Sequence, residues 1–115
     1  MILVIMQMKV SAVKRKELSQ TVSSLLGSIR GQRGCRRCDF FHLVDDDNDL
    51  CLLEEWDAQK NIDAYFSSEI FKVLRGALNL LEEPCEIICY QCLPPVGVQQ
   101  GSCLEIGSEN PQGRE

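Results

Sequence analysis

Apolar residues recur at every second position at the start of the chain and predict a β-strand over residues 2–10. One face of this strand carries Ile2, Val4, Met6, Met8 and Val10. Successive side chains of a strand point to opposite faces, so these five side chains share one side of a sheet. Leu3 and Ile5 make the first half of the other face apolar too. A strand that is apolar on both faces is typical of the centre of a sheet.

The apolar spacing then changes to that of an α-helix over residues 13–30. One stripe at helical spacing holds Leu18, Val22, Leu25, Leu26 and Ile29. A short helix is expected after Asp57, a good N-cap residue, and it ends near Phe66. Ser67 or Ser68 can cap a third helix, which Pro84 stops. The chain therefore carries one long helix and a later pair.

Further strands are expected over residues 35–45, 50–56 and 86–93. The acidic run at residues 45–49 separates the first two of these as a turn, since short acidic side chains satisfy the local backbone. From Pro94 onward the sequence is rich in Gly, Gln, Ser and Pro. We therefore expect one domain over residues 1–94 and a tail over residues 95–115 that is mobile or lies on a partner.

The order β-α-β-β-α-β predicts an α+β, ferredoxin-like fold with a four-stranded antiparallel sheet. Both helical segments then cover the same face of the sheet. The other face keeps apolar side chains, and a second copy of the chain is the simplest cover for them. We therefore expect a homodimer.

Composition limits the partners and the location of the chain. Of its 115 residues, 44% are hydrophobic and 25% are charged, which is typical of a globular domain. The formal net charge of −5 argues against nucleic acid, because phosphate binding needs a concentrated basic surface. No stretch approaches the roughly 20 apolar residues that span a bilayer, and we recognise no targeting segment. We expect a cytoplasmic protein without a membrane partner.

The stretch from Leu52 to Phe71, LLEEWDAQKNIDAYFSSEIF, resembles the signature of the antibiotic biosynthesis monooxygenase family. That signature is a strand ending in Glu-x-Trp, a short helix, and a small polar residue that opens a helix with an aromatic in its first turn. The segment LLEEP at residues 80–84 also fits, and the element order matches over about residues 1–93. The resemblance implies a dimeric α/β barrel whose two sheets pack face to face, with a substrate cavity between each sheet and its own helices.

Known branches of this family include cofactor-independent oxygenases of quinols and phenols, and haem-degrading enzymes. The haem-degrading branch has a histidine nine residues after the motif tryptophan, where this chain has Tyr65, and an asparagine on the first strand, where it offers Gln7. We therefore expect no haem and no other cofactor or metal in such an oxygenase. Its substrate would be a small aromatic compound.

Four residues are candidates for that chemistry. Trp56 can supply an aromatic wall and an indole N–H, and Tyr65 can hydrogen-bond a phenolic oxygen. His42, the one histidine, is the candidate base because its ordinary pKa is near neutral, and Asn61 can orient a carbonyl. Trp56, Tyr65 and His42 also have structural interpretations, as a core aromatic, a helix-capping side chain and a satisfied histidine, respectively.

Two alternatives stay open. The same fold can serve as a non-catalytic ligand-binding or interaction domain. The seven cysteines include two Cys-x-x-Cys pairs, Cys35 with Cys38 and Cys89 with Cys92, which favour a thiol or metal-binding protein. Arg36 and Arg37 are expected to lower the thiol pKa of the first pair.

Overall fold

A five-stranded antiparallel sheet forms one layer of the computed structural model, which describes residues 1–92 and the strand at residues 103–109. The strands are β1 (Ile2–Lys9), β2 (Cys35–Leu43), β3 (Asp46–Trp56), β4 (Glu86–Cys92) and β5 (Cys103–Glu109). Their order across the sheet is β2-β3-β1-β4-β5. The first four reproduce the predicted ferredoxin-like arrangement, with β1 at the centre as its two apolar faces require.

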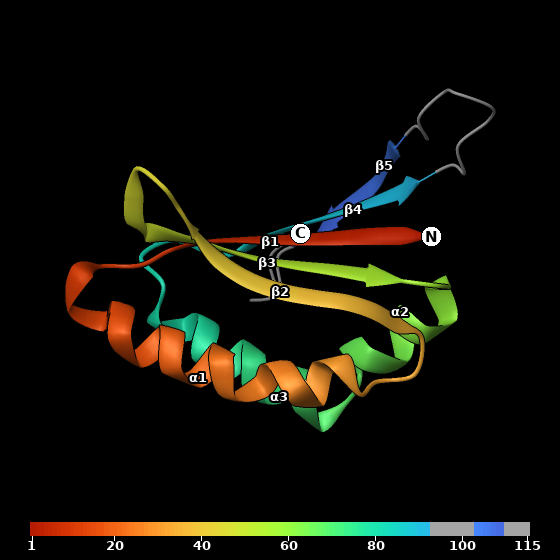
Figure 1. The fold of residues 1–115 in the computed structure, drawn as a ribbon, viewed down its shortest axis with the longest axis horizontal. Coiled ribbons are helices and arrows are strands. Elements are labelled where there is room, and N and C mark those ends of the chain that lie inside the picture. Colours follow the sequence, from red (N-terminus) through yellow and green to blue (C-terminus); the bar gives the residue numbers. More distant parts are fainter. Residues whose placement is uncertain (93–102, 110–115) are drawn as a thin grey trace.

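Helices cover one face of this sheet (Figure 1). They are α1 (Ala12–Arg30), α2 (Gln59–Phe66), α3 (Glu69–Ala77) and a 3₁₀ turn at Leu78–Leu80. The Ser68 hydroxyl accepts a hydrogen bond from the Phe71 backbone N–H at 3.2 Å, so Ser68 is the expected cap of α3. Across the residues that the structure describes, no helix is long and apolar enough to cross a membrane.

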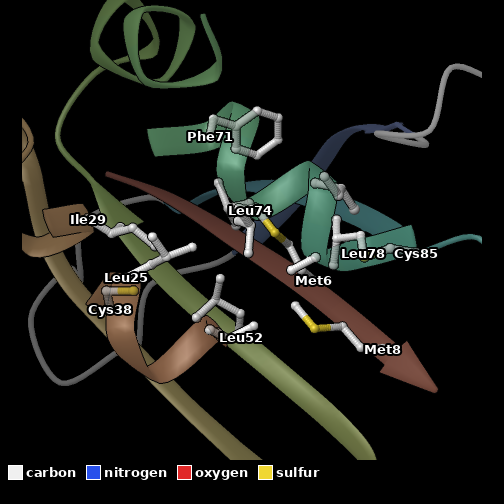
Figure 2. Packing of buried hydrophobic residues seen from close by; sticks show 14 of the residues in the cluster. Met6, Met8, Leu25, Ile29, Cys38, Leu52, Phe71, Leu74, Leu78 and Cys85 are labelled. Atoms are coloured by element: carbon white, nitrogen blue, oxygen red, sulfur yellow. The ribbon is translucent and has the colours of Figure 1, made fainter. Parts of the chain in front are cut away.

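The hydrophobic core lies between this face and the helices (Figure 2). The alternate residues of β1 that were predicted to share a face are all buried, and Met6 and Met8 are fully so. Leu18, Val22, Leu25 and Ile29 bring the apolar stripe of α1 against them. Full burial of such a side chain stabilises the fold by about 1.5–3 kcal/mol. This packing fixes which residues of β3 point inward: Leu50, Leu52, Glu54 and Trp56.

No helix covers the opposite face among the residues that the structure describes (Figure 1). Leu3, Ile5 and Leu53 lie on this face and are only half-buried. Phe41 of β2 remains 44% exposed there. The sheet therefore presents the apolar outer face that the sequence pattern predicts.

Two segments differ from the sequence-based expectation. The acidic run is mostly strand: the turn occupies residues 44–45, and β3 begins at Asp46. Residues 103–109 of the predicted tail pair with β4 as β5, because an exposed strand edge offers unpaired backbone groups to any neighbouring extended segment. Residues 93–102 and 110–115, which include the rest of that tail, lie outside the described residues.

Candidate functional site

A buried carboxylate, Glu54, lies at the centre of the candidate site. Its side chain is fully buried between the sheet and the helices. Strand alternation explains its position, because Glu54 shares the inward face of β3 with Leu52 and Trp56. Glutamate is almost never fully buried unless hydrogen bonds satisfy its carboxylate, so the partners of Glu54 are central to the site.

Two aromatic side chains satisfy the Glu54 carboxylate. The indole Nε1–H of Trp56 donates to Glu54 Oε1 at 3.0 Å. The phenol O–H of Tyr65 donates to Glu54 Oε2 at 2.9 Å. Trp56 comes from the end of β3 and Tyr65 from α2, so hydrogen bonds to this carboxylate connect the sheet with the short helix. The structure thus brings together two of the four predicted site residues and adds Glu54.

The rings of these two residues also stack on each other. The Trp56 and Tyr65 centroids lie 4.8 Å apart with an interplanar angle of 27°. Phe71 packs edge-on against Tyr65 with centroids 5.3 Å apart, and Phe66 packs against both. Trp56 and Tyr65 are at most 1% exposed. The inner end of the site is therefore dry, apolar and tightly packed.

Burial sets the protonation state of this cluster. It raises the pKa of Glu54 from 4.5 to about 7, although the hydrogen bonds from Trp56 and Tyr65 act in the opposite direction. Burial and the neighbouring Glu54 charge raise the pKa of Tyr65, which stays a protonated donor. Glu54 can therefore gain or lose a proton near neutral pH, as a general acid or base requires.

Asn61 lies near this cluster but bonds elsewhere. Its Nδ2–H donates to Asp57 Oδ1 at 2.7 Å, and its side chain is nearly buried. Both residues pack over Gly34, whose positive φ of 85° permits the turn into β2. Asn61 thus holds the start of α2 against the start of β2, and its predicted contact with a carbonyl stays a prediction.

His42 lies apart from the other three predicted residues. It is near the hairpin end of β2, four residues beyond Cys38, which corresponds to about 13 Å along a strand. Its side chain is 55% exposed and contacts the Leu43 carbonyl oxygen at 2.8 Å and Asp47 Oδ1 at 3.4 Å. The structure therefore supplies Glu54, and not His42, as the titratable group beside Trp56 and Tyr65.

The thiols of Cys35 and Cys38 border the cluster. A β-bulge between Cys35 and Arg37 places both cysteines on the inward face of β2, where they pair with Trp56 and Glu54 of β3. The expectation that nearby arginines lower their pKa is wrong. Burial raises the pKa of both thiols, and that of Cys38 reaches about 12, with the Glu54 charge adding to the effect. Both thiols are therefore protonated and weakly reactive at neutral pH.

The described residues contain no group of three or more His, Cys, Asp or Glu side chains placed to hold a metal ion. Cys35, Cys38, Cys51 and Cys85 are free thiols. The Cys-x-x-Cys pairs therefore gain no support as zinc sites, because a structural zinc ion needs four ligands.

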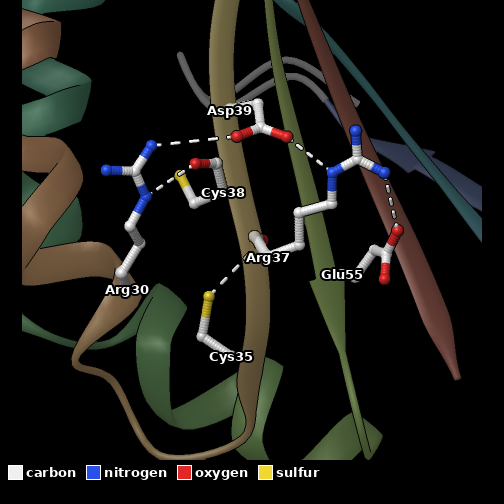
Figure 3. Close-up of polar contacts among 6 residues, drawn as sticks. All are labelled: Arg30, Cys35, Arg37, Cys38, Asp39 and Glu55. Carbon is white, nitrogen blue, oxygen red and sulfur yellow. Dashed lines mark hydrogen bonds and ion pairs between the residues drawn. The ribbon is translucent and has the colours of Figure 1, made fainter.

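A pocket of about 330 Å³ opens beside the cluster, at the outer edge of β2. We call it the β2 pocket and define it by its lining residues, which are Arg30, Cys35, Arg36, Arg37, Cys38 and Asp39. Figure 3 shows five of them, from the end of α1 and the first half of β2. Cys38 links the two regions, because it lines the pocket and lies opposite Glu54 in the sheet.

Comparison with known proteins gives one family and several similar folds. The family model described as antibiotic biosynthesis monooxygenase matches residues 1–76. A crystal structure of an antibiotic biosynthesis monooxygenase superposes with a TM-score of 0.75 at 20% identity, covering 82% of this chain and all of the other. A conserved protein from Methanosarcina mazei Go1 superposes with a TM-score of 0.75 at 25% identity, covering 78% of this chain and 90% of its own. A search of curated proteins gives no match.

Proposed function

The chain belongs to the antibiotic biosynthesis monooxygenase family, and from that premise we propose that it is a cofactor-independent monooxygenase of a small phenolic or quinol substrate. Glu54 is the proposed base, and Trp56 and Tyr65 hold it and form the aromatic wall. The observation that carries this proposal is the buried Glu54 carboxylate, whose pKa of about 7 matches the task of accepting a phenolic proton near neutral pH.

The proposed reaction starts with proton transfer from a substrate hydroxyl to the Glu54 carboxylate. The resulting phenolate gives one electron to O₂, and the radical pair combines to form a C–O bond at a ring carbon. The peroxide anion formed in this way takes the proton back from Glu54, which leaves a hydroperoxide and restores the carboxylate. Loss of water from this hydroperoxide leaves a quinone. One O₂ is consumed per substrate, one oxygen atom enters the product and the other leaves as water. A dry site favours these steps because it excludes competing water.

The substrate must reach Glu54 past side chains that now enclose it. Cys38 separates Glu54 from the β2 pocket, and its thiol is protonated and uncharged. In the proposed route, the substrate enters from that pocket, displaces the Cys38 side chain and meets the carboxylate beside Tyr65. Both carboxylate oxygens keep a second lone pair for a new donor.

We also propose that the working unit is a homodimer in the cytoplasm. Leu3, Ile5, Leu53 and Phe41 leave an apolar face that the helices do not cover. A second copy would bury it, as expected from the family resemblance. The free thiols of Cys35, Cys38, Cys51 and Cys85 suit a reducing compartment.

Oxygen consumption with a panel of phenols and hydroquinones tests the proposal. We expect enzyme-dependent O₂ uptake above autoxidation, with one ¹⁸O atom from ¹⁸O₂ in the product. In the pH profile, kcat/KM should rise through about pH 7, and Glu54→Gln should abolish the rise. His42→Ala is the control and should keep the wild-type profile. Absence of uptake across the panel would count against an oxygenase, and full activity of Glu54→Gln would remove Glu54 as the base.

A non-catalytic ligand-binding domain is the second candidate. The observation that favours it is the tight stacking of Trp56 on Tyr65, which fills the inner end of the site. Binding of the same aromatic compounds without O₂ uptake would support this alternative.

A further inference from the structure

The β2 pocket is a positively charged site on an acidic chain. Its lining holds three guanidinium groups, from Arg30, Arg36 and Arg37, and one carboxylate, from Asp39. The chain as a whole has a net charge of −5. The local excess of positive charge therefore runs against the overall balance and would attract a small anion.

Two of the three arginines are already committed to protein groups (Figure 3). Arg30 Nε–H donates to the Cys38 carbonyl oxygen at 2.9 Å, and its Nη2 lies 3.8 Å from Asp39 Oδ1. Arg37 pairs with Asp39 and, through Nη1 at 3.3 Å, with Glu55. Arg30 thereby donates a hydrogen bond to a backbone carbonyl on the open edge of β2, so its role there is structural.

Arg36 differs from its neighbours. Among the residues that the structure describes, no carboxylate lies within ion-pair distance of its guanidinium group. The long contact between Arg30 and Asp39 is also weak enough for a ligand to compete with it. Arg36, assisted by Arg30, can therefore take a ligand carboxylate through its planar pair of N–H donors.

The rest of the lining suits an aromatic ring. Cys35 and Cys38 line the pocket, and in the sheet they pair with Trp56 and Glu54. Their protonated thiols are uncharged and apolar in character. A volume of about 330 Å³ is near the lower end of the range for small-molecule sites, so the ligand is small.

We propose that the β2 pocket binds the carboxylate of a small aromatic acid through Arg36, with the ring over Cys35 and Cys38 and directed toward Glu54. For the substrate class, this inference rests on the proposed function: the substrate is a phenol or hydroquinone that carries a carboxylate. The binding part of the inference stands without any turnover.

Calorimetry with benzoate and benzamide tests the binding part, because the two probes share a ring and differ in charge, and neither is an oxidisable phenol. We expect benzoate to bind at least about tenfold more tightly, and added salt to weaken it. Arg36→Gln should weaken benzoate about tenfold and leave benzamide unchanged. Arg33→Gln is the matched control, because Arg33 lies in the same basic run but does not line the pocket. Equal binding of the two probes, or equal effects of the two variants, would overturn the inference.

Turnover separates this inference from the proposed function. With 2,5-dihydroxybenzoate and hydroquinone as substrates, the ratio of their kcat/KM values should favour the acid and fall about tenfold in Arg36→Gln. Hydroquinone oxidation without preference for the acid would overturn the carboxylate site and leave the oxygenase intact. Benzoate binding that depends on Arg36, with no O₂ uptake from either substrate, would support the site and refute the oxygenase.

Discussion

Replacing Glu54 by glutamine tests the central physical claim about the site, the raised pKa of a buried carboxyl, independently of any activity. Glutamine has nearly the same shape and cannot ionise. Its amide oxygen can accept from Trp56 Nε1, and its amide N–H can donate to the Tyr65 oxygen. The variant is therefore close to a permanently neutral form of Glu54, and it should resemble the wild type wherever Glu54 is protonated.

The expected effect follows from proton linkage. The folded carboxyl has a pKa of about 7, and 4.5 is its ordinary value. Between these values the folded state binds more protons than the unfolded state, so the free energy of unfolding falls as the pH rises. The stabilisation is complete below the lower pKa and is lost through about pH 7. The full difference corresponds to roughly 3 kcal/mol, and most of it falls between about pH 5 and about pH 8.

Urea unfolding followed by circular dichroism measures this effect at several pH values and one fixed protein concentration. The free energy of unfolding of Glu54→Gln, relative to wild type, should rise by about 2–3 kcal/mol from about pH 5 to about pH 8. Glu55→Gln is the matched control, since Glu55 is the next residue of β3 and pairs with Arg37 on the opposite face. A constant difference between Glu54→Gln and wild type across this window would refute the assignment of a raised pKa.

Three further outcomes are expected. Gly34→Ala should lower the free energy of unfolding in urea by at least about 2 kcal/mol, because φ is positive there and a Cβ would meet the Asp57 and Asn61 side chains. Gly27→Ala is the control and should not lower it, because the space around Gly27 is open. Leu53→Glu should produce a monomer in analytical ultracentrifugation if the outer face is the dimer interface, while Val13→Glu on the solvent side of α1 should leave the dimer unchanged. Cys38 and Cys85, each with a pKa near 12, should react with a thiol reagent at about pH 8 on the order of 10³-fold more slowly than exposed thiols, and unfolding should remove the difference.

The amino-acid pattern alone predicts the element order and most of the core. The alternation in β1 and the helical stripe of α1 predict the buried residues, because one buried face forces a periodic pattern; Leu26 of the stripe is only partly buried. The family signature followed from the same stretch of β3 and α2. β5 was missed because its short apolar alternation lies within a Gly-, Ser- and Pro-rich segment, and only the free edge of β4 shows that it can pair.

The candidate site depended on tertiary structure to a greater extent. Alternation with Leu52 and Trp56 already predicts that Glu54 points inward. A glutamate is usually exposed to solvent, however, so its burial is not expected until its hydrogen-bond partners are known. The buried carboxylate has a local partner in Trp56, but its second partner, Tyr65, lies eleven residues later and comes within hydrogen-bond distance only because α2 packs on the sheet. Likewise, the sequence alone makes His42 a candidate base, but its position near the far end of β2 places it away from the aromatic cluster. Local pattern fixes which face a side chain occupies, whereas proximity between elements, and with it the pKa, is set by the packing of the whole fold.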